Sequence, residues 1–360
     1  MTRRGDAGTL QRPMASLKLA NLWRVISDVD LERIRAAARM PFELLVVADD
    51  DAVGQRVRVG LGAVEGGGVH PYVVAVDPDN AQQRPTTPLI AVLASATPDL
   101  SVRMKAADEH CIRNNVPRIT LIVGTDAPEA AARRVAEQVR VAVVDVMNAP
   151  RPLLSTIVGM VEGDARLALA AALPVFRQVV ADAVVDETAK ANASFAVTTG
   201  LAETIPVLTA PLNLGDMVIL TKNQLIMGYK IALAAGRDDD PRSMISEILG
   251  VIGGGFMFRQ VARQLVGLIP VAGLVPKVAI AYAGTYAMGR ALTTWALGGT
   301  EVTAESLSRY TTEGLDRGRA LAKHLIGQVS AGVPSPARSW QRLRGWLPSR
   351  PSRPGPNPKA

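Results

Sequence analysis

The stretch Gln264–Gly289 most constrains this chain of 360 residues, because Lys277 is its only charge and it contains no side chain typical of catalysis. A membrane-spanning helix needs about 20 apolar residues, and Pro270 and Pro276 divide this run into shorter pieces. A lysine near its middle would cost about 3 kcal/mol on an insertion scale. We therefore expect a bent helical hairpin that is either buried in a helical domain or dipped into a membrane.

Small apolar residues dominate the composition: apolar residues make up 48% of the chain and aromatic residues only 4%. Cores built from Ala, Val, Leu, Ile and Gly let helices approach closely, as they do in membrane bundles. A coding bias towards GC-rich codons would produce the same composition. We expect close helix packing at Ala281, Gly284, Thr285 and Gly289, and such surfaces would also allow a homo-oligomer.

Cysteine usage and the N-terminus bear on the compartment. Cys111 is the only cysteine, so no intramolecular disulfide can form, which indicates a reducing compartment. The first residues, MTRRGDAGTL, include no apolar segment typical of a secretory signal. We therefore expect the protein on the cytoplasmic side of a membrane rather than exported.

Residues 1–40 form the first predicted region. Within Ser16–Met40, apolar residues from Leu19 to Ile34 recur near helical spacing, and the opposite side of this helix is basic. We expect this amphipathic helical region to pack against the domain that follows, with a lipid-facing role as the alternative.

Residues 41–150 alternate between short apolar runs and helical patterns. The runs at 42–48, 72–76, 89–94, 119–124 and 141–146 each predict a buried strand. The helical patterns lie at 52–64, 100–114 and 128–138. Continuous apolar strands that alternate with helices predict a mostly parallel α/β sheet covered on both faces. The gap from Val76 to Leu89 is Pro- and Asp-rich and looks too short for a packed helix, so the second and third strands could instead pair as a hairpin.

Residues 151–330 predict an all-α domain. Helices are expected at 153–160 and 164–199, and an amphipathic helix pair at 301–329. Between them the triplets Ile205-Pro206-Val207 and Ile269-Pro270-Val271 are each followed by a second proline, a helix and a glycine. We interpret these as a degenerate repeat of helical hairpins; chance similarity in a Gly- and Ala-rich chain is the alternative.

Residues 331–360 predict a disordered basic tail. Beyond Pro334 it has six basic residues and no acidic one, which accounts for nearly all of the net charge of +7. Its Pro- and Ser-rich composition is typical of a solvated segment. The alternative is contact with anionic lipid, with arginines in the surface potential and tryptophans at the interface. The residues of this lipid contact would be Arg338, Trp340, Arg342, Arg344 and Trp346. Nucleic acid would use the same charges, but no recognition motif accompanies them, so we expect no nucleic-acid partner.

The turn after the first predicted strand decides whether the α/β domain binds a nucleotide. A phosphate-binding loop needs glycines, a Lys and a Ser or Thr, whereas this turn begins Asp49-Asp50-Asp51 and no GK[ST] motif occurs in the domain. Carboxylates would repel phosphate oxygens, which argues against ordinary nucleoside triphosphate hydrolysis. Asp49 and Asp50 are weak candidates for an unorthodox nucleotide site, and a solvated acidic turn is the simpler interpretation. We expect no cofactor.

Two other interpretations of this domain fail on particular residues. Asp126 could accept a hydrogen bond from a guanine edge, but Gly124-Thr125 replaces the Asn-Lys of a guanine motif, so a helix N-cap fits Asp126 better. The acidic turn would also suit a phospho-receiver domain. However, the third predicted strand ends in Ala94-Ser95-Ala96 with no phospho-accepting Asp, and the fifth ends in Asp145-Val146-Met147 with no Lys. No catalytic constellation or metal site can be assembled from the three histidines and the cysteine.

The helical half resembles a known family. The segments that carry the resemblance are Asn192–Leu201, Ile205-Pro206, Asp216, Asn223-Gln224, Met227–Lys230, Phe258–Arg263, Leu268–Pro270 and Ala281–Arg290. They are similar to the uncharacterised helical domain of YcjF-like bacterial inner-membrane proteins, which frequently follows a GTPase domain. The resemblance implies a membrane-associated helical module and an upstream α/β domain like that of P-loop GTPases. Because the phosphate loop, the switch Asp-x-x-Gly and the guanine motif are absent, the upstream domain is interpreted as a degenerate pseudo-GTPase.

These observations favour a non-catalytic, membrane-associated scaffold or partner-binding protein at the inner face of a membrane. Its partners would be anionic lipid and a protein. The residues expected to contact the membrane or to pack helices are Pro270, Pro276, Ala281, Gly284 and Gly289. One alternative is a soluble nucleotide-responsive switch or unorthodox GTPase-like enzyme with its site at Asp49–Gln55. Another is a wholly soluble helical interaction protein.

Overall fold

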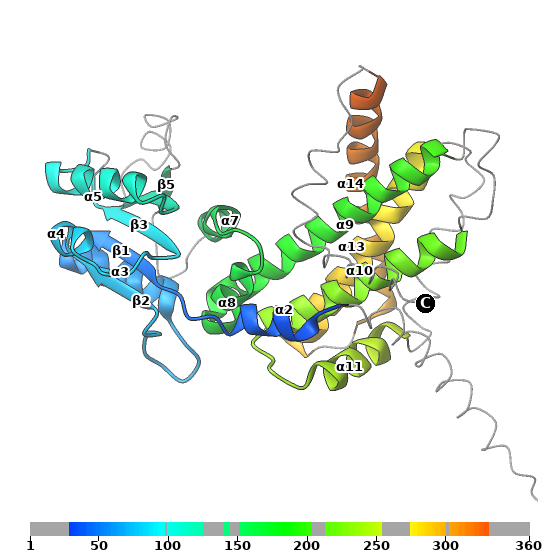
Figure 1. Ribbon diagram of the computed structural model, residues 1–360, viewed down its shortest axis with the longest axis horizontal. Helices are drawn as coiled ribbons and strands as arrows, with labels where there is room; N and C mark the ends of the chain where they lie inside the picture. Colours follow the sequence, from blue (N-terminus) through cyan, green and yellow to red (C-terminus); the bar gives the residue numbers. More distant parts are fainter. Residues whose placement is uncertain are drawn as a thin grey trace, which may run out of the picture.

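The computed structural model describes residues 29–97, 99–124, 140–143, 151–202, 213–253, 274–299 and 302–330. These residues form an α/β domain and a helical domain, which lie on opposite sides of the molecule (Figure 1). The predicted fold class is confirmed at this level: strands alternate with helices as far as residue 143, and every described element from residue 151 onward is helical. Several expected sites lie outside the described residues, namely Asp126, Pro270, Arg338, Trp340, Arg342, Arg344 and Trp346.

A parallel sheet of five strands organises the α/β domain, with the order β2-β1-β3-β4-β5. The strands are β1 (Leu44–Ala48), β2 (Val73–Val76), β3 (Ile90–Ser95), β4 (Arg118–Val123) and β5 (Arg140–Val143). Each of them overlaps an apolar run that the sequence marks as a strand, and none extends more than one residue beyond its run. The runs are visible in the sequence because both faces of a parallel sheet are covered, so that inward and outward positions are both apolar.

The hairpin considered for the second and third strands is wrong. The strand β1 lies between β2 and β3, and Leu44 pairs with Val73 on one side and with Ile90 on the other. The connection from β2 to β3 contains the short helix α4 (Pro78–Gln82). A crossover between parallel strands needs about a dozen residues, and the segment after Val76 meets that length despite its prolines and aspartates.

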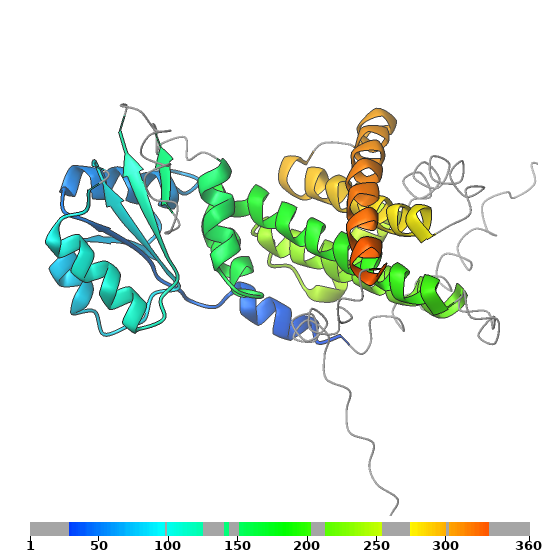
Figure 2. The same cartoon turned by 90° about the horizontal axis from the view of Figure 1, so that it is seen from above.

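Helices cover both faces of the sheet (Figure 2). The helix α3 (Asp51–Gly62) buries Val57 and Leu61 in the same cluster as Leu44 and Val46 of β1. On the other face, α4 and α5 (Val102–Arg113) pack over Leu45 and its neighbours. Alternate residues of one strand therefore belong to two separate hydrophobic layers, as the two-residue period of a strand requires.

Long helices build the second domain. They are α7 (Arg151–Met160), α8 (Ala165–Ala172), α9 (Arg177–Ala202), α10 (Asn213–Ala234), α11 (Pro241–Gly253), α13 (Leu274–Gly298) and α14 (Ala304–Ser330), with a 3₁₀ turn η1 (Pro174–Phe176) before α9. Two sequence predictions are corrected here. The helix expected at 164–199 is interrupted, because Leu173 is extended before Pro174 and so ends α8. The helix pair expected at 301–329 is the single helix α14.

Pro276 does not interrupt the apolar run in the described part of the chain. It is the third residue of α13, in the first turn, where its missing backbone N–H would have no intrahelical acceptor. From there α13 continues through Gly289 to Gly298. Within the described residues, the chain is therefore helical at this proline and shows no bend into a second segment there. The other expected bend, at Pro270, lies outside the described residues.

The first described helix, α2 (Leu31–Ala38), packs on the helical domain rather than on the α/β domain that follows it in the sequence. Its neighbours are α8, α10 and α11. Arg39, which ends α2, donates a 2.9 Å hydrogen bond from Nε to Oδ1 of Asp238, just beyond α10, and Arg35 Nε donates to the same oxygen at 3.1 Å. The chain thus begins its described part on the helical domain, forms the α/β domain and then returns.

Candidate functional site at the carboxyl edge of the sheet

The strand order identifies the edge at which a ligand site would be expected. After β1 the chain turns into α3 and runs to β2 on one side, whereas after β3 it turns into α5 and runs to β4 on the other. In open α/β sheets, ligands bind outside the carboxyl ends of the strands at such a switch point. The residues that follow Ala48 and Ser95 therefore form the candidate site.

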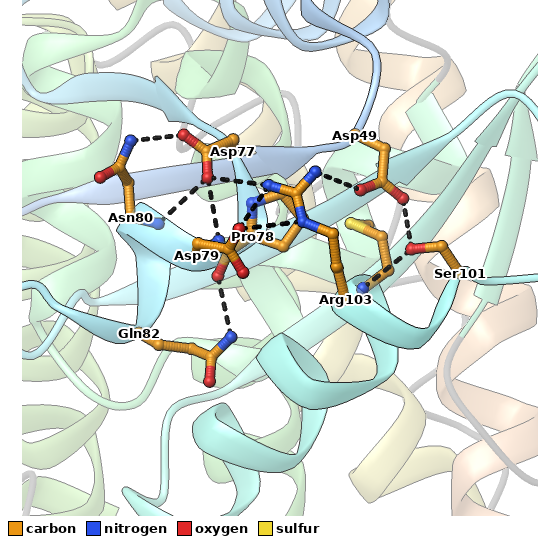
Figure 3. A network of polar contacts seen from close by, with 9 residues as sticks. Asp49, Asp77, Pro78, Asp79, Asn80, Gln82, Ser101 and Arg103 are labelled. Atoms are coloured by element: carbon orange, nitrogen blue, oxygen red, sulfur yellow. Dashed lines mark hydrogen bonds and ion pairs between the residues drawn. The ribbon is translucent and has the colours of Figure 1, made fainter.

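Asp49 lies at this switch point and is held by two residues from the start of α5. The hydroxyl of Ser101 donates a 2.5 Å hydrogen bond to Asp49 Oδ2, and Arg103 Nη1 lies 3.7 Å from Asp49 Oδ1 (Figure 3). Ser101 also caps α5, because its Oγ accepts from the backbone N–H of Met104 at 3.1 Å. The first acid of the turn is therefore bound to the turn after β3.

The next two acids serve the helix that follows them. The carboxylate of Asp50 accepts a 3.0 Å hydrogen bond from the backbone N–H of Val53, which makes Asp50 the N-cap of α3. Asp51 is exposed in the first turn, where its charge favours the positive end of the helix dipole. The three consecutive carboxylates thus have different environments, and they do not converge on one centre.

Arg103 connects Asp49 to the turn after β2. Its Nη2 lies 2.7 Å from Asp79 Oδ2 and 3.3 Å from Asp77 Oδ1, so one guanidinium contacts three carboxylates (Figure 3). The pKa of Arg103 is raised, first by its hydrogen bond to Asp79. The pKa of Asp77 is lowered, first because the backbone N–H of Asn80 donates to its carboxylate.

These contacts define what the edge can do chemically. The position where a cation or a phosphate would be expected holds a protein guanidinium that is already paired with carboxylates. Among the described residues, no group of three or more His, Cys, Asp or Glu side chains is placed to hold a metal. Ser95, which ends β3, bonds locally to Thr97 through its hydroxyl. The edge therefore offers a network of ion pairs between one guanidinium and three carboxylates.

The helix-packing candidates lie on α13 and differ in exposure. Gly289 is buried, and a Cβ there would lie 2.6 Å from Val185 Cγ2 of α9. Ala281 and Gly284 are partly exposed, and the Ala281 carbonyl accepts a 3.0 Å hydrogen bond from Thr285. Close packing at Gly289 therefore has a direct geometric reason.

A buried polar contact joins three of these helices. The side-chain amide of Asn192 in α9 donates a 2.8 Å hydrogen bond to Thr285 Oγ1 in α13. Asn192 Oδ1 in turn accepts a 2.7 Å hydrogen bond from Asn223 in α10. Asn192 is fully buried, so these bonds replace the water that its amide would otherwise bind. The resemblance segments at Asn192 and Asn223 thus have a structural role.

Sequence reasoning missed residues at both places. Ser101 and Arg103, at the start of α5, were not considered as partners of the acidic turn. Ser101 is 52 positions from Asp49 in the sequence, and only the strand order brings the two together. Gly314 and Gly318 of α14 were also missed: a Cβ on Gly314 would lie 2.9 Å from Cα of Ala283. The glycine spacing of four in α14 was the available signal, because it places both residues on one helix face.

Known proteins provide no further assignment. Comparisons with protein-family models, with curated proteins and with solved structures found no match to this chain. Within the described residues, no helix combines the length and the apolar character needed to cross a membrane.

Proposed function

We propose that this protein is a non-catalytic, membrane-associated scaffold whose α/β domain binds a protein partner. The observation that carries the proposal is the guanidinium of Arg103, which contacts Asp49, Asp77 and Asp79 at the carboxyl edge. A doubly wound sheet places its ligand at this edge. Here a guanidinium of the chain itself is paired with the carboxylates at this edge, which favours a role in binding rather than in catalysis.

The finer description of the α/β domain also belongs to the proposal. The resemblance of the helical half implies a degenerate P-loop GTPase upstream, but the hairpin expected with it is absent and the five strands run parallel. The order β2-β1-β3-β4-β5 is the one shared by flavodoxins and receiver domains. We therefore favour a degenerate domain of this second type, in which Ser95 ends β3 where a receiver would need its phospho-accepting Asp.

The membrane part of the proposal rests on sequence. The YcjF-like segments imply a membrane-associated helical module, and the tail combines Arg338, Arg342 and Arg344 with two tryptophans. Basic residues near a cytoplasmic leaflet each add about 1 kcal/mol of attraction to anionic lipid. A peripheral or partly embedded protein at the inner face of a membrane accommodates both features.

Calorimetry tests the non-catalytic assignment. Titration of the full-length protein with GTP or ATP, each with magnesium, should give no saturable heat. An Arg103→Gln variant should give none either, because removing the guanidinium leaves carboxylates that repel phosphate. Saturable binding at micromolar concentration would instead support the alternative function, a nucleotide-responsive switch at Asp49–Gln55.

Membrane fractionation tests the localisation. The protein should sediment with bacterial membranes. Release by high salt alone would indicate a peripheral association driven by the basic tail, and retention through both salt and carbonate washes would indicate embedded segments. Recovery of the protein in the soluble fraction before any wash would contradict membrane association and favour a soluble interaction protein.

A further inference from the structure

The segment Leu31–Arg39, which we call the strap, belongs to one domain by sequence and to the other by its contacts. It consists of the helix α2 and the residue that follows it. The helix packs against α8, α10 and α11 of the helical domain, whereas the chain continues from Arg39 directly into β1 of the α/β domain. Its polar partner Asp238 is 199 positions from Arg39 in the sequence. The strap therefore bridges the two domains.

The apolar attachment of the strap is small. Ile34 and Ala38 are its buried side chains, and Leu31 is partly buried beside them. The helix has eight residues, and isolated helices shorter than about 12 residues are marginal in water. The helical structure of the strap therefore depends on docking. Elements with few buried apolar contacts are also the ones that open locally at the lowest free energy.

The polar attachment of the strap is largely exposed to solvent. The side chains of Arg39 and Asp238 are 53% and 54% exposed. Arg35 also donates a 2.7 Å hydrogen bond from Nη2 to the backbone carbonyl oxygen of Asp238. Ion pairs at such exposure contribute little to stability and are screened by salt. These contacts orient the strap, and they can break without leaving a buried charge behind.

A buried hydroxyl at the contact of α2 with α10 opposes docking. Tyr229 of α10 is fully buried, and its Oη has no hydrogen-bond partner among the described residues. Burial raises the pKa of Tyr229 to about 12, and the charged groups that affect this pKa most are Arg35 and Glu32 of α2. A hydroxyl that loses water and gains no partner costs free energy. The docked strap therefore carries a cost that an open strap would not.

We infer that the strap is releasable: Leu31–Arg39 undocks as a unit while the sheet and the long helices stay folded. Opening lets water reach the hydroxyl of Tyr229, and it removes one attachment of the α/β domain to the helical domain. Another attachment is the 2.5 Å hydrogen bond that Arg177 of α9 donates from Nη1 to Glu65 Oε1 in the loop after α3. Docking of the strap thus restricts the movement of the α/β domain. This inference is independent of the proposed membrane association.

Amide hydrogen exchange, measured by mass spectrometry on the full-length protein, tests the release. The amides of residues 34–39 should exchange much faster than those in the middle of α9. Added salt should speed exchange in the strap and leave α9 unchanged, because it screens the ion pairs with Asp238. Equal protection of the strap and α9 would overturn the inference, since α2 would then open only when the whole helical domain unfolds.

Two variants should change exchange of the strap in opposite directions. Tyr229→Phe should slow it about tenfold, because docking no longer buries an unpartnered hydroxyl. Asp238→Asn should speed it about threefold, because the exposed ion pairs are lost. Tyr286→Phe is the matched control: the hydroxyl of Tyr286 donates to Glu313 Oε1 at 2.7 Å, between α13 and α14. This variant should leave exchange of the strap unchanged.

The direction of the effect at Tyr229 decides the outcome. Faster or unchanged exchange of the strap in Tyr229→Phe would show that the hydroxyl does not oppose docking, and it would overturn the inference. Wild-type exchange in Asp238→Asn would do the same for the ion pairs. Protection of α9 in each variant reports whether the helical domain is folded, and the salt dependence of the wild-type protein tests the release without any substitution.

Discussion

A Cβ atom on Gly318 would lie 2.8 Å from the backbone carbonyl oxygen of Ala279, closer than any side chain can be accommodated without movement. The helices α13 and α14 therefore touch backbone to backbone at this position. Gly318→Ala should lower the free energy of unfolding by about 1–3 kcal/mol, because a methyl group has to separate the two helices. Urea unfolding followed by circular dichroism measures the change.

Gly327 in the same helix provides the matched control. A Cβ there would meet nothing within 4 Å, and the residue is exposed. Gly327→Ala should raise the free energy of unfolding by up to about 1 kcal/mol through helix propensity alone. If Gly318→Ala and Gly327→Ala change the free energy of unfolding in the same direction, the close contact with Ala279 does not explain the effect of Gly318→Ala.

The strands show how far local pattern determines the fold. The run that contains β1 was recognisable because Leu44, Leu45, Val46 and Val47 are all buried, three of them completely. Burial on both faces removes the usual alternation, and it leaves a signal that a short window of sequence contains.

Strand order and the candidate site depend on contacts that no local window contains. The hairpin expected for β2 and β3 was wrong because pairing with β1 decides their neighbours, and that choice is made by the whole sheet. The same holds for Arg103, whose partner Asp77 is 26 positions away. The acidic turn itself was visible in the sequence, whereas the cation that pairs with Asp49 could be identified only from the strand order.

The capping role of Asp50 can be separated from the general effect of acidic charge. Asp50→Ala removes the acceptor for the Val53 backbone N–H and should cost about 1 kcal/mol of stability. Asp51→Ala, at an exposed position in the first turn, should cost only about 0.3 kcal/mol. Chemical denaturation of both variants makes the comparison. Equal losses would show that helix-dipole charge, and not the cap, explains the contribution of Asp50.

The ion pair between buried Lys230 and partly exposed Asp164 should respond unequally to loss of either partner. Lys230 is only 3% exposed, and its Nζ lies 2.6 Å from Asp164 Oδ1. Asp164→Asn should cost about 2–3 kcal/mol because it leaves a buried ammonium without this carboxylate. Lys230→Met should cost less, since it removes the buried charge and keeps an apolar stem of similar length. A larger loss for Lys230→Met would contradict this assignment.

The pH dependence of the Asp164→Asn variant has a defined sign. Burial already lowers the pKa of Lys230 below its ordinary value of 10.5, and loss of Asp164 should lower it further. The unfolded chain then binds more protons than the folded protein, so stability rises with pH. Relative to wild type, the deficit of the variant should shrink as the pH approaches 10.5. A deficit that stays constant with pH would show that Lys230 keeps its proton in the folded variant.

Asp238 should contribute to stability only above acid pH. The pKa of Asp238 is lowered from the ordinary value of 3.8. The largest cause is the hydrogen bond from Arg39, the residue that follows α2; burial opposes it, and the hydrogen bond from Arg35 of α2 lowers the pKa further. A lowered carboxyl pKa stabilises the folded state above the unfolded pKa, and this stabilisation is lost as the pH falls through the folded value. Wild type should therefore lose more stability than Asp238→Asn as the pH falls below about 4. Denaturant titrations at a series of pH values compare the two proteins, with Asp240→Asn as a control, because the carboxylate of Asp240 accepts hydrogen bonds from the backbone N–H groups of Arg242 and Ser243 in α11. Parallel pH profiles for wild type and Asp238→Asn would show that the attachment of α2 does not depend on this carboxylate.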